Sequence, residues 1–456
     1  MLKTSRRMIF LVLAGICLTC GCGSGTSATY PVVVFSDVHF NPFYDKSLFP
    51  ALVASDASEW ASIFATSSVT EPSAWTTDTN YPLLVLALSS IKQNLGASPL
   101  VIYTGDVLGH NFPQTFFTLY GSQDVAAMKA FTDKTVAFFL EEVRSYVGNI
   151  PVMFVLGNSD SYTGDGPDSD YLSNTAELYY ANFVSGAVDH QTFLDTYTSG
   201  GYYSAEPLGT SMMVIGLNTF ALSTLVIGNN DSEVQAELSW LDSSLASAKA
   251  AHKKAWLLMH VPLGAYLAET ANQLDSSGHL TTATMMLKPD YQTSLLQILS
   301  KYPGIITLML AGHTHMDEFR DISVGTSSSD GALEITPGIT PYFGNNPAYK
   351  VFTFLSGTYE PADYSSLNYD LATMPGQFNS YYTFSTVYSM QDLLDAALAG
   401  LFPMLAADDA KQTLYRGYYY SGNNSANPIT DANWPVFWCG IGKMAEQELV
   451  DCVNSY

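Results

Sequence analysis

Histidine, aspartate and asparagine gather in five short polar blocks, each of which directly follows an apolar run of the chain. In chain order the blocks are Ser36–His39, Thr104–Asp106, Gly157–Asp160, Met259–His260 and Gly312–His315. Four of the eight histidines fall within them. Imidazole, carboxylate and amide groups together suit Zn, Fe or Mn, whereas Ca prefers oxygen ligands alone. The blocks therefore predict a centre that holds two adjacent divalent cations.

Two cations side by side need one carboxylate that reaches both, and Asp106 is the natural bridge. Asp37 and His39 are separated by one residue, so on an extended chain their side chains point to the same side and can reach one cation. The same spacing lets His313 and His315 share a cation if that segment is extended. A pair of cations roughly 3.5–4 Å apart clamps a phosphoryl group and lowers the pKa of a bridging water, which becomes the nucleophile.

The apolar runs in front of the blocks have the length and composition of strands that are buried on both faces. We expect strands at 31–35, 100–103, 152–156, 212–217, 256–259 and 305–310. The residue patterns between these runs predict helices at 83–95, 125–147 and 232–251. Alternating strands and helices indicate an α/β fold. Such sheets bind their ligands at the carboxyl ends of the strands, which is where the polar blocks lie.

The first 21 residues are expected to be a signal peptide, because three basic residues precede an apolar core at 8–18 that is too short to span a bilayer. A flexible tether at 22–29 follows and begins with Cys22. This arrangement resembles the lipid-attachment site of bacterial lipoproteins, although the usual leucine lies one place early, at Leu18. We expect an exported cell-envelope lipoprotein that is anchored to the membrane through Cys22. Ordinary cleavage and release as a secreted protein is the alternative.

The 456-residue chain has a formal net charge of −24, which becomes −27 once residues 1–21 are removed. Such a charge repels nucleic-acid backbones and excludes a protein that grips long nucleic acid, while a small phosphoester can still bind where metal charge dominates. Beyond residue 22 the sequence contains two cysteines, Cys439 and Cys452. In an exported chain they suggest one disulfide, with two buried free thiols as the alternative.

The blocks resemble the metal-binding motifs of the calcineurin-like metallophosphoesterase superfamily, and their flanking residues are most similar to those of acid sphingomyelinase-like phosphodiesterases. The segments that carry this second likeness are FSDVHFNPFY at 35–44, TGDVLGHN at 104–111, GHTHMDEF at 312–319 and TPGITPYFGNNP at 336–347. The resemblance implies a four-layer α/β/β/α sandwich. It places the catalytic domain at 30–350 and a partly helical appendage, packed on that domain, at 351–456.

The resemblance also implies how the ligands divide between the two cations. The first cation takes Asp37, His39, Asp106 and His315, and the second takes Asp106, Asn158, His260 and His313.

One position departs from the family pattern: Ser159 stands where relatives have a histidine that assists the leaving group. A serine hydroxyl is a poor proton donor near neutral pH. We expect His110, four residues after Asp106, to protonate the leaving group or to contact the phosphate, with a purely structural hydrogen-bonding role as the alternative. Asp160 is a second candidate catalytic residue, which would orient a water or a histidine. Low activity is the remaining possibility.

Two further positions bear on the metal and the substrate. Purple acid phosphatases carry a tyrosine three residues after the bridging aspartate, and Gly109 occupies that place here. This glycine argues against an iron–tyrosinate site, so Zn is the expected metal, with Fe or Mn as alternatives. Asn346 is a candidate substrate contact, but Gly-Asn and Asn-Pro steps also favour turns, so a loop-fixing role is equally consistent with the sequence.

The sequence thus predicts an exported, metal-dependent phosphodiesterase that hydrolyses a small phosphoester, such as a nucleotide or a phosphocholine ester. Two alternatives stay open. The chain could be a catalytically weakened surface protein that binds metal, or a phosphomonoesterase of the 5′-nucleotidase type. The sequence does not indicate an oligomeric state.

Overall fold

The computed structural model describes residues 28–456 apart from 229, 323–330, 392, 424 and 427–428. The expected signal peptide, the lipidation site at Cys22 and most of the tether lie outside these residues. Within them, no helix combines the length and apolar character needed to cross a membrane.

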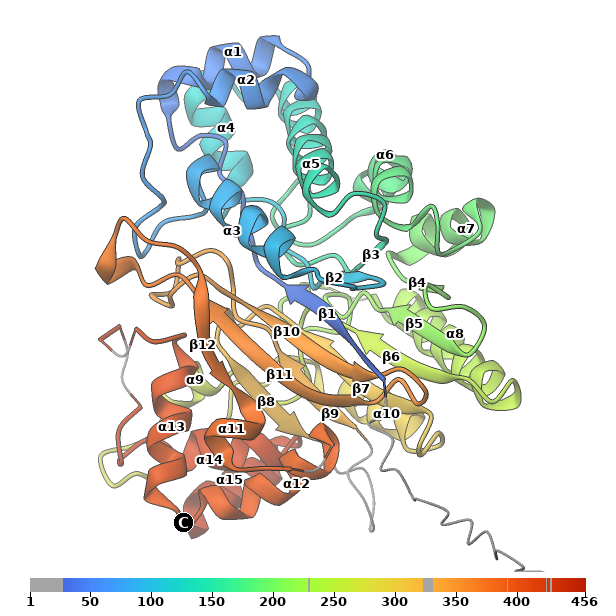
Figure 1. The fold of residues 1–456 in the computed structure, drawn as a ribbon, viewed down its shortest axis with the longest axis vertical. Coiled ribbons are helices and arrows are strands. Elements are labelled where there is room, and N and C mark those ends of the chain that lie inside the picture. Colours follow the sequence, from blue (N-terminus) through green and yellow to red (C-terminus); the bar gives the residue numbers. More distant parts are fainter. Residues whose placement is uncertain (1–27, 229, 323–330, 392, 424, 427–428) are drawn as a thin grey trace, which may run out of the picture.

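Two six-stranded sheets form the centre of the molecule (Figure 1). The first sheet has the strand order β12-β11-β10-β1-β2-β3, and the second has the order β4-β5-β6-β7-β9-β8. Strands β1, β2 and β3 run parallel, and so do β5, β6, β7 and β9. Every polar block predicted from the sequence follows one of these parallel strands.

The strands of the first sheet are β1 (Thr29–Phe35), β2 (Val101–Tyr103), β3 (Val152–Phe154), β10 (Ala348–Leu355), β11 (Pro361–Asn368) and β12 (Asn379–Thr383). Those of the second are β4 (Tyr203–Ala205), β5 (Met212–Gly216), β6 (Lys254–Leu258), β7 (Ile306–Ala311), β8 (Glu318–Asp321) and β9 (Ala332–Ile335).

The α-helices are α1 (Phe49–Ala54), α2 (Trp60–Phe64), α3 (Tyr81–Asn94), α4 (Phe112–Tyr120), α5 (Val125–Val147), α6 (Ser169–Tyr179), α7 (His190–Gly200), α8 (Asp231–Ala250), α9 (Leu267–Ala271), α10 (Pro289–Leu299), α11 (Phe384–Tyr388), α12 (Leu394–Leu405), α13 (Asp409–Tyr419), α14 (Trp434–Gly442) and α15 (Glu446–Ser455).

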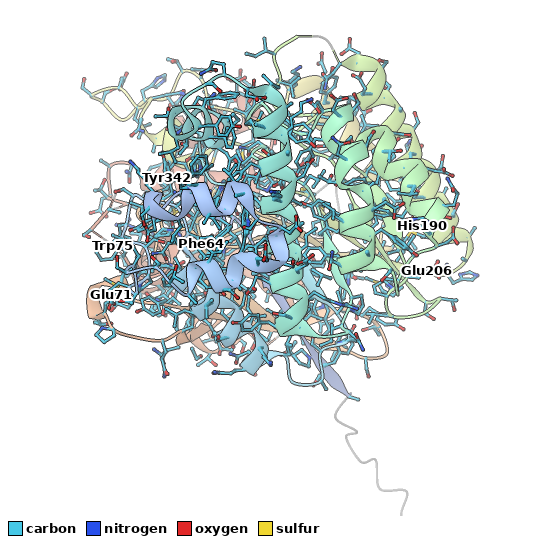
Figure 2. The ribbon with its side chains drawn as sticks, turned by 90° about the horizontal axis from the view of Figure 1, so that it is seen from above. Phe64, Glu71, Trp75, His190, Glu206 and Tyr342 are labelled. Carbon is cyan, nitrogen blue, oxygen red and sulfur yellow. A yellow bond between two sulfur atoms is a disulfide. The ribbon has the colours of Figure 1, made fainter. Side chains whose placement is uncertain are left out.

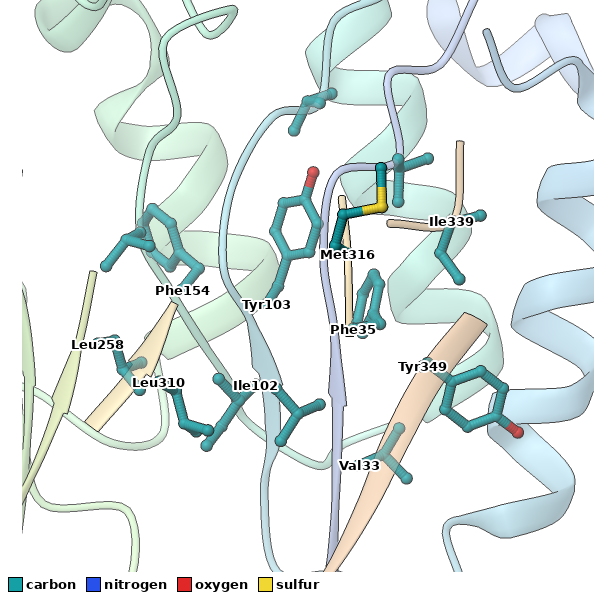
Figure 3. Packing of buried hydrophobic residues seen from close by; sticks show 14 of the residues in the cluster. Val33, Phe35, Ile102, Tyr103, Phe154, Leu258, Leu310, Met316, Ile339 and Tyr349 are labelled. Carbon is teal, nitrogen blue, oxygen red and sulfur yellow. The ribbon is translucent and has the colours of Figure 1, made fainter. Parts of the chain in front are cut away.

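Both faces of the second sheet are buried. Successive side chains of a strand point to opposite faces, so neighbouring residues of β6 enter different apolar clusters. Trp256 and Leu258 belong to the large cluster between the sheets, and the Trp256 ring lies 4.1 Å from that of Phe354 on β10. Leu257 and Met259 belong instead to the cluster beneath α8 and α10. Figure 3 shows the inter-sheet packing, in which Ile102 and Leu310 meet. A strand that is buried on both faces needs apolar residues at successive positions, which explains the continuous apolar runs in the sequence.

Helices cover the outer faces of both sheets, so the expected four-layer α/β/β/α sandwich is confirmed (Figure 1). Helices α3 and α5 pack over the first sheet, and α8 and α10 pack over the second. Helix α3 begins where the Asn80 side chain accepts a hydrogen bond from the Leu83 amide, which satisfies one of the free donors of the first turn.

The C-terminal region contributes to the first sheet before it becomes helical. The expected boundary at residue 350 lies inside β10, which pairs antiparallel with β1 from Thr29↔Leu355 to Val34↔Lys350. Helices α11–α15 then pack around β8 and the edge of the first sheet. The structure pairs Cys439 on α14 with Cys452 on α15 as a disulfide, with the Cα atoms 6.0 Å apart.

We expect Cys452→Ser to lower the free energy of unfolding by roughly 2–3 kcal/mol, because the crosslink closes a loop of 13 residues and restricts the unfolded chain. Urea unfolding measures this loss. Adding a thiol reductant to the wild type should reproduce the loss and should leave the variant unchanged. Equal stability of the oxidised and reduced wild type would contradict the pairing.

Candidate metal centre

The candidate ligands converge at the carboxyl ends of five parallel strands. The loop after β1 supplies Asp37 and His39, and the loop after β2 supplies Asp106. Asn158 follows β3, His260 follows β6, and His313 and His315 follow β7. The two sheets therefore bring together all seven residues that the sequence singled out, and all of them are buried or nearly so.

The backbone at these ligands is not extended, which corrects the strand-based reasoning for Asp37 and His39. Both residues adopt the left-handed conformation, with φ of 46° and 44°. His313 and His315 do the same, with φ of 73° and 64°. Non-glycine residues rarely adopt this conformation, and such strain concentrates at functional sites. Tight left-handed turns, rather than strand alternation, aim the side chains at one point.

Asp106 lies at the middle of the cluster. Its Oδ2 is 3.2 Å from His39 Nε2 and 3.2 Å from His260 Nε2. Its Oδ1 accepts a hydrogen bond of 2.7 Å from the Ser159 amide, which fixes the carboxylate. One oxygen is thus held by the backbone while the other faces histidines on both sides. This arrangement would let Oδ2 alone reach a cation on either side, so the bridging role stays a prediction.

The remaining ligands fall into two groups around Asp106. His315 Nε2 and His39 Nε2 lie 3.5 and 3.9 Å from Asp37 Oδ1. On the other side, Asn158 Oδ1 lies 3.1 Å from His260 Nε2 and 2.9 Å from His313 Nδ1. His260 Nε2 also lies 4.0 Å from Asp37 Oδ1, so the division of ligands that the family resemblance implied stays a prediction.

Backbone carbonyls orient two of the histidine rings. His39 Nδ1 lies 2.9 Å from the Leu108 carbonyl oxygen, and His260 Nδ1 lies 2.7 Å from that of Thr104. A carbonyl can only accept, so each Nδ1 carries the proton and each Nε2 is free to bind a cation. Such contacts fix the tautomer of metal-binding histidines.

Burial and neighbouring charges shift the pKa values of the histidines in the cluster. Burial lowers the pKa of His39 and His260, but the Asp106 carboxylate more than compensates and raises both to about 9. Burial and the neighbouring charge of His260 lower the pKa of His313 to about 3. Divalent cations would displace the protons shared between these groups, so their binding is expected to release protons.

The donor set fits divalent cations. His315 Nδ1 is buried and has no hydrogen-bond partner among the described residues, and the buried His39 Nε2 lies 3.2 Å from Asp106 Oδ2 without hydrogen-bond geometry. Asp37, His39 and Asp106 offer ligand atoms that lie within 4.8 Å of one another, and so do His39, His110 and His315. Buried nitrogen lone pairs beside carboxylates are costly without a partner, and a cation would satisfy them.

His110 lies at the edge of this cluster and is held by Asp78. The carboxylate of Asp78 accepts hydrogen bonds of 2.7 Å from both the His110 Nδ1 and the His110 amide. The ring stacks between His39, at 4.0 Å, and Tyr342, at 3.9 Å. Burial lowers the pKa of His110, and the charge of His39 lowers it further, against the opposing effect of Asp78.

Sequence reasoning missed Asp78 and the aromatic wall beside the centre. Asp78 lies in a loop before α3, outside every polar block, and only its position two residues before the Asn80 cap gave a weak signal. Trp75, Tyr342 and the half-exposed Phe343 line a hollow next to the cluster. Figure 2 shows Trp75 and Tyr342 on the same side of the molecule and His190 at the opposite edge.

Asp160 and Asn346 are both occupied by structural contacts. The Asp160 carboxylate is fully buried and accepts hydrogen bonds from the amides of Asp106, Val107 and Gly157. Asn346 accepts hydrogen bonds from the Trp75 indole and the Leu371 amide, and donates one to the Ser421 carbonyl. These contacts favour the loop-fixing role that the sequence left open for Asn346.

Comparisons with known proteins show the family to which the chain is related. The family model described as calcineurin-like phosphoesterase matches residues 30–317. The cyclic GMP-AMP phosphodiesterase SMPDL3A of Rattus norvegicus is 26% identical over 396 residues, which cover 83% of this chain and 82% of that protein. Sphingomyelin phosphodiesterase B of Dictyostelium discoideum is 23% identical over 470 residues, covering 94% of this chain and 66% of that protein. The crystal structure of a dimetal phosphatase from Danio rerio gives a TM-score of 0.41 at 13% identity, covering 74% of this chain and 95% of that chain.

Proposed function

The chain belongs to the calcineurin-like phosphoesterase family, with acid sphingomyelinase-like relatives, and from this premise we propose that it hydrolyses a small phosphodiester at the candidate metal centre. The observation that carries the proposal is the position of Asp106, whose Oδ2 lies 3.2 Å from a histidine nitrogen on either side. Two divalent cations bound there, Zn first and Fe or Mn as alternatives, would polarise the phosphoryl group and acidify a water.

The protein's own residues position the reacting groups. His39 and His260 present Nε2 because backbone carbonyls hold their Nδ1 protons. Asp160 takes no part in proton transfer in this proposal. It is a positioning residue, whose carboxylate fixes the turns that carry Asp106 and Asn158. This replaces the proposal that Asp160 orients a water or a histidine.

His110 is the residue that we propose to assist the leaving group. Asp78 accepts the proton on Nδ1, which leaves Nε2 of a ring with a part-exposed side chain to contact a phosphate oxygen or to deliver a proton. Among the described residues, the Ser159 hydroxyl has one long hydrogen bond of 3.5 Å, from the Asn158 side-chain amide, so none of them prepares it as an acid. The lowered pKa of His110 means that its proton is available chiefly below neutral pH.

Hydrolysis of bis-p-nitrophenyl phosphate and p-nitrophenyl phosphate tests the function. We expect turnover of the diester by the protein loaded with Zn and loss of that turnover on chelation, with recovery when Zn is restored. Preferential turnover of the monoester would favour the 5′-nucleotidase type. No turnover of either ester by a protein that retains two Zn per chain would identify a metal-binding surface protein.

We predict that Ser159→His preserves diesterase activity or raises it by up to about tenfold, because an imidazole beside the bridging carboxylate adds an acid of suitable pKa. The steady-state kcat across pH measures the effect, and Ser159→Ala serves as the control for loss of the hydroxyl alone. A loss of more than about tenfold in the histidine variant, with normal metal content, would show that the local site is built around serine.

The substrate and the location of the protein complete the proposal. A soluble nucleotide or phosphocholine diester fits the part-open centre beside Tyr342 and Phe343, whose rings can contact an organic group. Export by the signal peptide and anchoring through Cys22 would place this activity at the bacterial cell surface. Mass spectrometry of the mature N-terminus distinguishes a lipidated Cys22 from simple cleavage.

A further inference from the structure

A second cavity, of about 560 Å³, lies outside the metal centre. The loop before α6, the end of α7, the loop after β5 and the first half of α8 surround it. Figure 1 shows α6, α7 and α8 on the same side of the molecule, flanking β4 and β5. None of the seven candidate metal ligands lines this cavity.

The charged lining of the cavity is entirely acidic. Four carboxylates line it: Asp165, Asp168, Glu233 and Glu237. No lysine, arginine or histidine is among its described lining residues. This lining disfavours an anion as the occupant and favours a positively charged group.

Glu237 is the buried member of this set, with 3% of its surface exposed. One of its oxygens accepts a hydrogen bond of 2.7 Å from the Asn218 amide, and no described residue bonds to the other or pairs with its charge. Burial raises the pKa of Glu237 to about 8, against the effect of the Asn218 hydrogen bond. A carboxylate in the first half of a helix, buried without a cation, is costly unless a ligand supplies the charge.

Asn218 adds a second, independent acceptor. It is 5% exposed, and its amide nitrogen donates to the Gly200 carbonyl at 2.9 Å, which assigns the other amide atom as oxygen. That oxygen has no hydrogen-bond partner among the described residues. Asn230 repeats the pattern: its amide nitrogen donates to Ala221 and its Oδ1 has no described partner. Two acceptors without described partners, Asn218 Oδ1 and Asn230 Oδ1, thus belong to residues that line the cavity.

We propose that this cavity binds a small organic cation with ammonium N–H donors, such as a linear polyamine. An ammonium group would donate to Glu237 and Asn218, and the buried rings of Tyr202 and Phe220 that line the cavity suit a cation. A bare metal ion fits less well, since no three carboxylates of the cavity are among the described groups with ligand atoms within 4.8 Å of one another. The proposal does not rest on the proposed phosphodiesterase activity.

Calorimetric titration with spermidine in 150 mM NaCl tests the proposal. We expect saturable binding of one spermidine to the wild type, and at least tenfold weaker binding to Glu237→Gln, which keeps the acceptor for the Asn218 amide. Glu233→Gln, at an exposed position of the same cavity, should weaken binding several-fold. Glu141→Gln on α5 removes an equal charge from an exposed position that does not line the cavity and should leave binding unchanged.

Proton release provides a second readout. Glu237 should lose its proton when the cation binds, so titrations at pH 7 in two buffers of different ionisation enthalpy should show release from the wild type and none from Glu237→Gln. The other titratable groups that line the cavity are Tyr202, Asp165, Asp168 and Glu233, and burial raises the pKa of Tyr202 above its usual value.

Three results would overturn the proposal: no saturable binding of spermidine, equal binding by the wild type and both cavity variants, or binding of Ca²⁺ without binding of spermidine. Melting temperature and diester hydrolysis verify that each variant is folded. If Glu237→Gln does not fold, Glu233→Gln and the proton release of the wild type decide the outcome. Failure of spermidine binding with intact diester hydrolysis would leave the proposed function standing.

Discussion

Asp106→Asn is expected to abolish diester hydrolysis, with a loss of at least about a thousandfold, and to reduce bound Zn from two to one or none per chain. The asparagine would keep one oxygen, which the Ser159 amide holds at 2.7 Å. Its NH₂ group would then face His39 and His260 in place of the carboxylate oxygen. An amide nitrogen cannot bind a cation there, and the negative charge shared by the two sites is lost.

Metal analysis after gel filtration and the kcat for bis-p-nitrophenyl phosphate measure these two effects. Asp409→Asn, at an exposed position in the first turn of α13, removes the same charge away from the centre and should change neither. Near-wild-type turnover with two Zn per chain in Asp106→Asn would show that another residue bridges the cations. A variant that keeps its melting temperature but loses both metal and activity would support the assignment.

The sheets were predictable because their strands carry a local signal. Each of the six predicted strands overlaps an observed one, and the predicted helix at 125–147 matches α5 residue for residue. Two of the later strands, β10 and β11, were missed for different reasons. β10 pairs with β1 across some three hundred residues, and the half-polar β11 has no apolar run that would mark it as a strand. Such segments become strands because they hydrogen-bond and pack against a neighbouring strand, not because of their own residue pattern.

The ligand types at the centre were also predictable, but their geometry was not. Aspartate, asparagine and histidine after apolar strands identify the donors, because parallel strands end at one edge. The left-handed turns at Asp37 and His39 carry no sequence signal, since neither is glycine. Asp78 illustrates the same limit, because tertiary packing alone brings its loop beside His110.

A fully buried ion-pair network joins the two sheets beside the metal centre. Lys350 on β10 lies 2.9 Å from Asp317 and 2.8 Å from Glu334 on β9. The hydroxyls of Tyr382 and Ser366 also donate to Asp317. Removing one partner from such a network leaves a charge without compensation in a medium of low dielectric constant.

We predict that Lys350→Met lowers the free energy of unfolding by about 3–5 kcal/mol at pH 8. Lys46→Met, at an exposed position, should change it by less than about 0.5 kcal/mol. Urea unfolding followed by circular dichroism measures both values. A loss below about 1 kcal/mol for Lys350→Met would show that the carboxyl groups around it are already neutral in the native protein.

The loss should depend on pH, and Glu334 sets the direction. Burial raises the pKa of Glu334 from 4.5 to about 7, although Lys350 opposes the shift. A carboxyl group whose folded pKa exceeds its unfolded value binds protons more tightly in the native state, so stability falls as pH rises from about 4.5 through 7. Without the positive charge of Lys350, the pKa of Glu334 in the folded protein must rise further. The penalty of Lys350→Met should therefore be smaller at pH 5 than at pH 8. Adding Glu334→Gln to the variant should reduce this pH dependence and restore part of the stability, since one buried charge is then removed together with its partner.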